Sequence, residues 1–433
     1  MPSSVALSAP GGSALGALSR IWTRVWFQDR PATPIEIARI GLGLALLLTY
    51  ALATPDIFIM WGDEGWLPRK LHGEIVQDPL RQSILYYVSA PWQFMAFHAV
   101  FVASCAALAV GWRTSLAKWI VLIGHVSYTH RNPGITYGFD SIAASLLVIL
   151  CFAPIGRTLS LDRVRQVRRA KRGDLPARPP VPTSQWGFAC TRLMQVQMAV
   201  LFLISGMEKL RGDEWWEGDA IWRVFVHTDY YNGTMLLDLL ASHFWLVNIA
   251  TYSTILIELA YPFLIWQRAT RPFLLALAIF LHVQFGLLMG LFFFSFTMIM
   301  GHMSFVSPEW LASLGAWWKR RAGAMEMIYD GRCGFCVRSM AWFLAFDGLG
   351  QISVRNFRVN PSPVVSDERM EKALYLFLAD GRALAGFEAY RYVVPRVPGL
   401  WWMVPFFYIP VVSRLFGHPI YNWIAANRSR MPF

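Results

Sequence analysis

The sequence contains several runs of roughly 20 residues in which charged side chains are almost absent. A helix of about that length crosses the hydrocarbon core of a bilayer, which is about 30 Å thick. Only 15% of the residues are charged and 55% are hydrophobic, whereas a soluble globular chain carries about 25% charged residues. These runs therefore predict an integral membrane protein built mainly from transmembrane helices.

The apolar runs divide into eight expected spans, which end at turn residues or at clusters of charge. The predicted spans are residues 34–53, 92–110, 117–128, 141–154, 186–207 and 244–266, and two short spans on either side of Gly290 within 273–305. We expect three parts, namely a leader and interfacial segment at 1–33, an all-α polytopic membrane domain at 34–318 and a small α/β domain at 325–433.

Basic residues indicate the orientation in the membrane. The formal net charge is +12, and the densest basic run, at 157–182, is expected to be a solvated loop between the fourth and fifth spans. Because cytoplasmic loops are enriched in Lys and Arg, this loop is placed in the cytoplasm. Eight spans then put the N-terminus and the C-terminal domain in the cytoplasm and the end of the fifth span outside. The basic runs flank apolar helices without a base-reading module, so we expect no nucleic-acid partner.

The fifth span ends abruptly in a charged, Trp-rich segment at 203–221. Lys209 therefore lies where an apolar helix leaves the hydrocarbon. Its ammonium either reaches out to the interface or is held neutral in an apolar pocket, where it would act as a base. Glu258, within the sixth span, could pair with Lys209 or with His282, or form a structural hydrogen bond between helices. His282 and His302 either line a pocket or are core histidines with satisfied hydrogen bonds.

Polar groups near the ends of other spans have two interpretations as well. Glu36 and Arg39 are three residues apart and can pair on one helix face. Asn132 and Tyr137 lie at the outer end of the third and fourth spans, where they either face the same cavity as Lys209 or cap helices.

From about residue 325 the pattern changes to alternating strand and helix. EMIYD reads as a strand, GRCGFC follows, and a helical run comes next, which is the order of a thioredoxin-like domain. The N-terminus of a helix stabilises a thiolate. We therefore predict a lowered pKa for Cys333, the attacking thiol, and a resolving role for Cys336. The alternative is half of a zinc site, but no further Cys or His pair follows at zinc spacing, so no metal is expected.

Three motifs in this region, YDGRCGFC, DGRALAGFEAY and PIYNWIAANR, resemble the DCC family of thiol-disulfide oxidoreductases. The family is named for an Asp-x-x-Cys-x-x-Cys signature, which Asp330, Cys333 and Cys336 match residue by residue. The resemblance covers 325–433. It implies a thioredoxin-like fold, a redox-active Cys333–Cys336 disulfide and a catalytic role for the signature residues, with the substrate left open.

The membrane part resembles the horizontally transferred transmembrane domain family, the bacterial relatives of the vitamin K-dependent gamma-carboxylase. The resemblance rests on RNPGITYG, on SGMEKL with the Trp and Gly that follow it, and on the late run around His282. In the carboxylase a lysine of the SGMEKL-like segment is taken as the base that deprotonates a reduced quinone, and Lys209 matches it. Where the carboxylases have a histidine, this chain has Pro133, which argues against glutamate carboxylation but leaves quinol binding open.

Together the resemblances imply a membrane oxidoreductase of the bacterial inner membrane that joins thiol-disulfide exchange to a quinone/hydroquinone (vitamin K-like) site with Lys209 as base. The expected partners are the lipid bilayer and a thiol-containing protein or small thiol. The candidate cofactor-binding residues are Asn132, Tyr137, Glu258 and His282. Three alternatives remain: carboxylase-like modification of an outer peptide, a membrane domain that only anchors a thiol reductase, and transport or maturation of a peptide.

Overall fold

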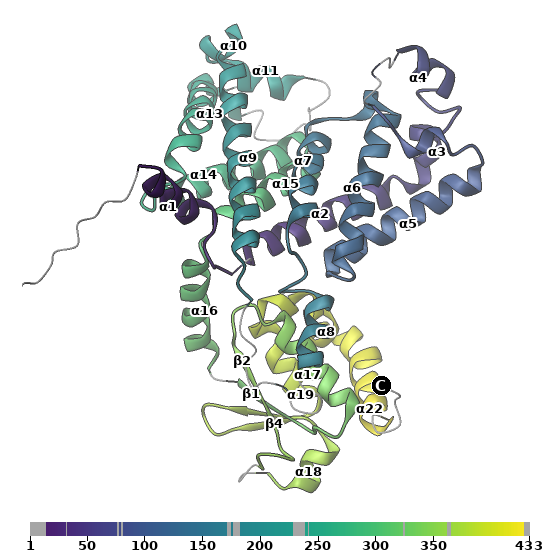
Figure 1. Cartoon of the computed structure of the whole chain (residues 1–433), viewed down its shortest axis with the longest axis vertical. Helices are drawn as coiled ribbons and strands as arrows, with labels where there is room; N and C mark the ends of the chain where they lie inside the picture. Colours follow the sequence, from purple (N-terminus) through teal and green to yellow (C-terminus); the bar gives the residue numbers. More distant parts are fainter. Residues whose placement is uncertain are drawn as a thin grey trace, which may run out of the picture.

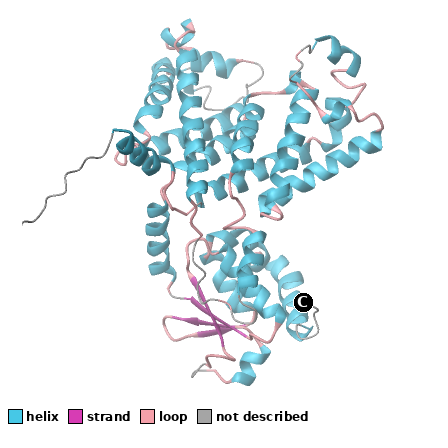
Figure 2. Cartoon of the chain, in the orientation of Figure 1, coloured by secondary structure: helices cyan, strands magenta, loops and turns pink. Residues whose placement is uncertain are grey.

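The computed structural model describes residues 14–31, 33–75, 78, 81–170, 175, 182–227, 239–240, 242–323, 325–361 and 365–427. The predicted leader falls largely at 1–13 and the Pro-rich end of the basic run at 176–181, and both lie outside the described residues. The chain forms an upper helical part and a lower part that contains a β-sheet (Figure 1, Figure 2).

The upper part is a bundle of helices whose bounds follow the apolar runs. Its main helices are α2 (Thr33–Leu52), α5 (Pro91–Val110), α6 (Thr114–Arg131), α7 (Gly138–Phe152), α9 (Gln185–Lys209), α13 (Phe244–Leu264), α14 (Arg271–Met289) and α15 (Phe292–His302). Shorter helices lie at its periphery: α1 (Ala14–Trp26), α3 (Ile57–Trp61), α4 (Arg69–Ile75), α10 (Asp213–Trp216) and α11 (Ala220–Val226). Gly290 separates α14 from α15 as predicted, because its φ of +70° ends α14 in a left-handed turn.

All eight predicted helices are present, but eight membrane spans are not confirmed. Among the described residues, five helices are long and apolar enough to cross a membrane, namely α2, α5, α9, α13 and α14. A sixth span would come from a bent pair near the C-terminus, Pro398–Tyr408 with Pro410–Asn427. α7 and α15 have only 15 and 11 residues, which is short for a bilayer core. α6 has 18 residues but carries Lys118, His125 and Arg131 along its length.

A buried ion pair near the N-terminal end of α2 links parts of the bundle, as the spacing of Glu36 and Arg39 predicts. Both side chains are fully buried, with Nε of Arg39 2.7 Å from Oε2 of Glu36. Arg39 also donates to the backbone carbonyls of Ala109, at the end of α5, and of Leu159. Oε1 of Glu36 accepts the backbone N–H of Arg157 at 2.7 Å. The pair therefore joins α2, α5 and the chain that follows α7.

The lower part is a small α/β domain. Its elements are β1 (Met325–Tyr329), α17 (Gly334–Phe346), β2 (Ile352–Asn356), α18 (Asp367–Lys372), β3 (Tyr375–Leu378), β4 (Ala383–Ala385) and α19 (Phe387–Val393). The mixed sheet has the order β2-β1-β3-β4, in which β1 and β2 are parallel and the other pairs antiparallel. β3 and β4 form a hairpin, and its turn contains Gly381 at φ +84°. The strand–CxxC–helix order expected from the sequence is present.

The basic run is not the solvated loop that its composition predicts. Residues Leu161–Ala170 form a helix, α8, that packs against α17 of the α/β domain. Val164 and Val167 lie on one face of α8 and are buried in the core of that domain, while Arg165 is exposed on another face. Leu175 joins the same core, and its N–H donates to the Tyr329 hydroxyl at 2.9 Å. Two valines three residues apart were enough to give a mainly charged helix a buried stripe.

Further helices connect the two parts and complete the lower one. α16 (Pro308–Ala322) leads from the bundle to β1. Its N-cap residue is Ser307, whose hydroxyl accepts the N–H of Trp310. After α19 the chain continues through a 3₁₀ segment (Pro398–Met403), α20 (Val404–Tyr408), α21 (Pro410–Val412) and α22 (His418–Asn427). These C-terminal helices cover α17 on the side away from α8 (Figure 1).

Candidate functional site

The first site is the cysteine pair at the start of α17. Cys333 is the N-cap residue, and its Sγ accepts the backbone N–H of Cys336 at 3.3 Å. The two sulfurs are 2.7 Å apart, and both cysteines are free thiols. Cys333 is partly exposed, whereas Cys336 is buried. The outer sulfur therefore lies where helix N–H groups favour negative charge, and the inner sulfur lies directly behind it.

Asp330 holds the loop that carries Cys333. Its carboxylate forms a two-pronged ion pair with Arg358, with distances of 3.1 and 3.0 Å, and accepts the N–H of Arg332. Arg358 also pairs with Glu371 at 2.7 Å, and these acidic partners raise the pKa of the guanidinium. Asn356 adds a further contact, since its Oδ1 accepts the N–H of Gly331. Asp330, predicted as a catalytic residue, is thus tied to the loop of Cys333, and its backbone carbonyl accepts the N–H of Cys333 at 3.1 Å.

Loss of the Asp330 carboxylate should slow thiol exchange without abolishing it. We expect Asp330→Asn to lower the rate with a small disulfide substrate by about threefold to tenfold, because a displaced nucleophile reacts more slowly. Arg358→Ala should give the same loss, and the double variant should lose no more than either single variant. Additive losses measured by stopped-flow kinetics would contradict a shared role. Exposed Arg382→Ala, in the β3–β4 hairpin, is the matched control.

The second site lies at the C-terminal end of α9, where Lys209 meets Glu258. Nζ of Lys209 is 2.8 Å from Oε2 of Glu258 on α13 and 2.7 Å from Oγ of Ser205 one turn earlier on α9. The ring of Trp215 packs 5.2 Å from the same nitrogen. The Lys209 side chain is 19% exposed and that of Glu258 is 7% exposed. Of the pairings left open by the sequence, the structure has the one between Lys209 and Glu258.

Two histidines continue this site into the bundle. His282 on α14 and His302 on α15 are buried, and their rings stack with centroids 5.3 Å apart. Nδ1 of His302 is 2.7 Å from the Tyr261 hydroxyl, so His302 is a core histidine with a partner. In the part of the chain that the structure describes, neither ring nitrogen of His282 has a hydrogen-bond partner. His282 packs against the Phe202, Phe285 and Phe294 rings.

Asn132 and Tyr137 occupy positions at helix ends. Asn132 accepts the N–H of Gly134 and donates to the Met60 carbonyl. Tyr137 precedes α7, where its N–H donates to the Asp140 carboxylate, and its side chain is exposed. Both positions fit the capping interpretation. The next residue, Gly138, lies against Phe294, and Phe294 also contacts His282. Phe294 therefore links the start of α7 to the second site.

Sequence reasoning missed a third polar cluster, in the N-terminal half of the bundle. The Tyr50 hydroxyl is 3.0 Å from Nδ1 of His125, whose Nε2 is 3.0 Å from the backbone carbonyl of Asp140. Nearby, Nδ1 of His98 is 2.8 Å from the Tyr128 hydroxyl. These residues are scattered over four helices without a motif, so no sequence pattern could have joined them. Among the described residues no group of three or more His, Cys, Asp or Glu side chains could hold a metal ion.

The two main sites lie at opposite ends of the molecule. Figure 1 shows the end of α9, beside α10, at the top of the bundle, and α17 in the domain below it. The long apolar helices and the CxxC at a helix N-terminus define a membrane protein that carries a thiol redox domain.

Comparison with protein families gives these parts their names. Residues 27–310, about two thirds of the chain, match the HTTM domain, and residues 327–433 match the DCC1-like thiol-disulfide oxidoreductase domain. The chain therefore belongs to the HTTM family and ends in a DCC1-like thiol-disulfide oxidoreductase domain, which confirms both resemblances. No curated protein and no solved structure matches the chain. At this level the protein is a membrane-associated thiol oxidoreductase.

Proposed function

We propose that the protein joins thiol-disulfide exchange at Cys333 and Cys336 to a quinone/hydroquinone-type site around Lys209, with a thiol-containing protein or small thiol as partner. The observation that carries the membrane site is the Lys209–Glu258 pair together with the buried His282, whose ring nitrogens have no partner among the described residues. Under this proposal the protein lies in a bacterial inner membrane with the N-terminus and the α/β domain in the cytoplasm. The dense basic residues at 157–170, beside that domain, support this orientation.

At the cysteines the exchange follows from the geometry. The Cys333 thiolate attacks one sulfur of a substrate disulfide, forming a mixed disulfide and releasing the other substrate sulfur as a thiol. The Cys336 sulfur, 2.7 Å away, then attacks Sγ of Cys333, so the substrate leaves with its second thiol and Cys333–Cys336 becomes a disulfide. The reverse sequence oxidises a dithiol substrate.

The residues around His282 suit an aromatic, two-oxygen ligand. Phe202, Phe285 and Phe294 supply apolar ring contacts, and His282 supplies ring nitrogens that have no partner in the described part of the chain. A bound quinone/hydroquinone couple would supply two-electron chemistry with protons at its two oxygens. Lys209 can pass a proton to Glu258 at 2.8 Å, and the resulting amine can accept one from a hydroxyl group. Ser205 holds the amine in place during this transfer.

The experiment that tests this proposal compares two single variants of the full-length protein. Lys209→Ala should lower the oxidation of hydroquinone by molecular oxygen by about 100-fold or more, the usual contribution of a general base. It should leave reduction of a soluble disulfide near the wild-type rate, since the cysteines lie at the other end of the molecule.

Arg211→Ala is the matched control. Arg211 is an exposed cation two residues away that pairs with Glu208 at the surface, so its loss should change neither rate. If a folded Lys209→Ala variant oxidises hydroquinone at the wild-type rate, this part of the proposal is wrong. The membrane domain would then act only as an anchor.

A further inference from the structure

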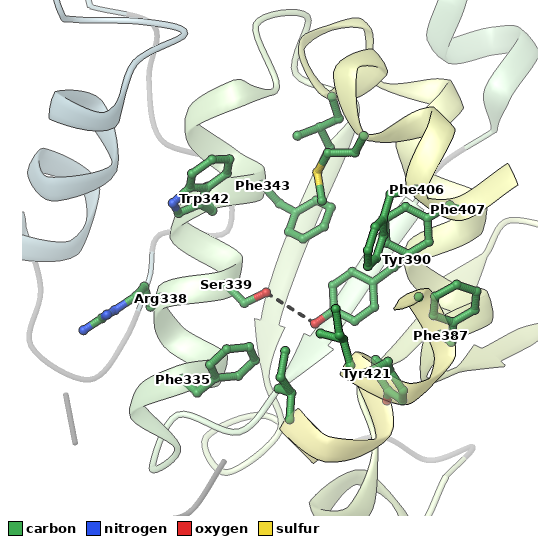
Figure 3. A pocket seen from close by; sticks show the side chains of 15 residues that line it. Phe335, Arg338, Ser339, Trp342, Phe343, Phe387, Tyr390, Phe406, Phe407 and Tyr421 are labelled. Atoms are coloured by element: carbon green, nitrogen blue, oxygen red, sulfur yellow. Dashed lines mark hydrogen bonds between the residues drawn. The ribbon is translucent and has the colours of Figure 1, made fainter. Parts of the chain in front are cut away.

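A cavity of about 340 Å³ lies in the α/β domain, between α17 and the C-terminal helices. Figure 3 shows Phe335, Trp342 and Phe343 on the α17 side, facing aromatic residues of the C-terminal part. Tyr390, Phe406 and Phe407 are among the rings on that opposite side. A volume of this size falls in the range of small-molecule sites, which is about 300–1,000 Å³.

The cavity leads to the redox-active cysteines. A second, narrower cavity is lined by Cys336 and shares Phe335, Tyr390 and Tyr421 with the first. Since Cys336 is buried, its thiol faces the protein interior rather than the solvent on the Cys333 side. A ligand in the aromatic cavity would therefore approach the pair from behind, through Cys336.

The surroundings of the cavity are apolar, which selects the class of ligand. One polar contact in its lining is between the Ser339 and Tyr390 hydroxyls, which are 3.3 Å apart (Figure 3). Arg338 extends away from the cavity in the same view. The C-terminal helices next to it expose large apolar side chains, among them Trp402 at 61%, which contacts Trp342, and Ile420 at 43%. Although Arg338 belongs to the lining, most of the cavity surface comes from aromatic and aliphatic side chains, which favour a flat, lipid-soluble ring.

We propose that this cavity binds the ring of a lipid-soluble quinone, which takes electrons from the Cys333–Cys336 dithiol. Two S–H bonds break and one S–S bond forms. The two electrons and two protons pass to the two carbonyl oxygens of the quinone, which leaves as hydroquinone. The Ser339 and Tyr390 hydroxyls hydrogen-bond to one of these oxygens. The inference rests on the proposed redox function of the cysteines, and it gives the α/β domain its own contact with the carrier proposed for the Lys209 site.

This site removes a difficulty in the arrangement of the two redox centres. If they face opposite sides of the membrane, a hydrocarbon core of about 30 Å separates them. A lipid-soluble carrier that docks beside Cys336 can move between them through the bilayer. The exposed apolar helices at the cavity provide a surface along which such a carrier can leave lipid.

The test measures two rates on the full-length protein in detergent. One is oxidation of the reduced cysteine pair by a short-tailed benzoquinone, and the other is oxidation of the same pair by a water-soluble disulfide. Ser339→Trp fills the cavity and should lower the ratio of the quinone rate to the disulfide rate by tenfold or more. Tyr390→Phe keeps the ring but removes the hydroxyl, and should raise the quinone concentration needed for half the maximal rate. Val359→Trp, at an exposed position of the same domain, should leave both rates unchanged.

The outcomes separate this inference from the proposed function. If wild-type protein reacts with the disulfide but not with the quinone, or if both cavity variants keep the wild-type ratio, the quinone site is wrong and the thiol exchange stands. If wild-type protein reacts with neither oxidant, the proposed function itself fails. A long-chain fatty acid can be tested as a competitor in the Cys333→Ser variant. If it displaces the quinone and binds more tightly than the quinone does, the choice of ligand is wrong.

Discussion

Replacing Arg39 with alanine is expected to destabilise the membrane domain by about 3–5 kcal/mol, the usual cost of breaking a buried ion pair. The Arg39 and Glu36 side chains have no exposed surface. Without the guanidinium, the Glu36 carboxylate stays buried with the backbone N–H of Arg157 as its close partner, and the Ala109 and Leu159 carbonyls lose a donor. The loss therefore combines an uncompensated charge with unsatisfied backbone groups.

The measurement is unfolding of the detergent-solubilised protein by heat or by denaturing detergent. Arg268→Ala, at an exposed turn between α13 and α14, is the matched control and should change stability by less than about 0.5 kcal/mol. The double variant Glu36→Leu/Arg39→Leu should recover part of the loss, because it leaves no buried charge. An Arg39→Ala protein as stable as the wild type would show that the pair does not hold the bundle together.

Replacing Cys333 with serine should abolish thiol-disulfide exchange, with a loss on the order of 1,000-fold or more, as for other catalytic nucleophiles. Cys333 is the partly exposed member of the pair and caps α17, so the substrate sulfur reaches it first. Cys336→Ser should behave differently. The first attack still takes place, but no inner sulfur remains to displace the substrate, and a mixed disulfide on Cys333 accumulates.

Turnover of a model disulfide and mass spectrometry under non-reducing conditions distinguish the two variants. The control is Cys151→Ser, because Cys151 is buried at the end of α7, where its thiol donates to the Lys118 carbonyl. It should keep the wild-type rate. A mixed disulfide trapped on Cys336 in the Cys333→Ser protein would reverse the two roles.

The sequence predicted the local parts of this structure better than their assembly. Helix positions followed from runs of apolar residues, and the Glu36–Arg39 pair followed from a spacing of three residues. The position of Cys333 at a helix N-terminus followed from strand and helix signals on either side. By contrast, α8 was predicted to be a loop because its charges dominate its composition, and only the core of the α/β domain explains Val164 and Val167.

The number of spans stays a prediction for a related reason. Hydropathy marks which residues avoid water, but it does not decide whether short apolar helices such as α7 and α15, with 15 and 11 residues, each cross a bilayer. Likewise, Asp330 belongs to a short signature that suggests catalysis, while its partner Arg358 lies 28 residues later and has no motif of its own.

The sequence by itself determined that this protein has apolar helices for a membrane, a CxxC after a strand and a lysine at the end of a span. Each of these depends on residues within one or two turns of each other. Tertiary structure alone decided that Lys209 pairs with Glu258, that His282 stacks on His302 and that an aromatic cavity adjoins Cys336. Those contacts join side chains from separate helices, and their distances follow from helix packing, which periodicity along one chain segment does not specify.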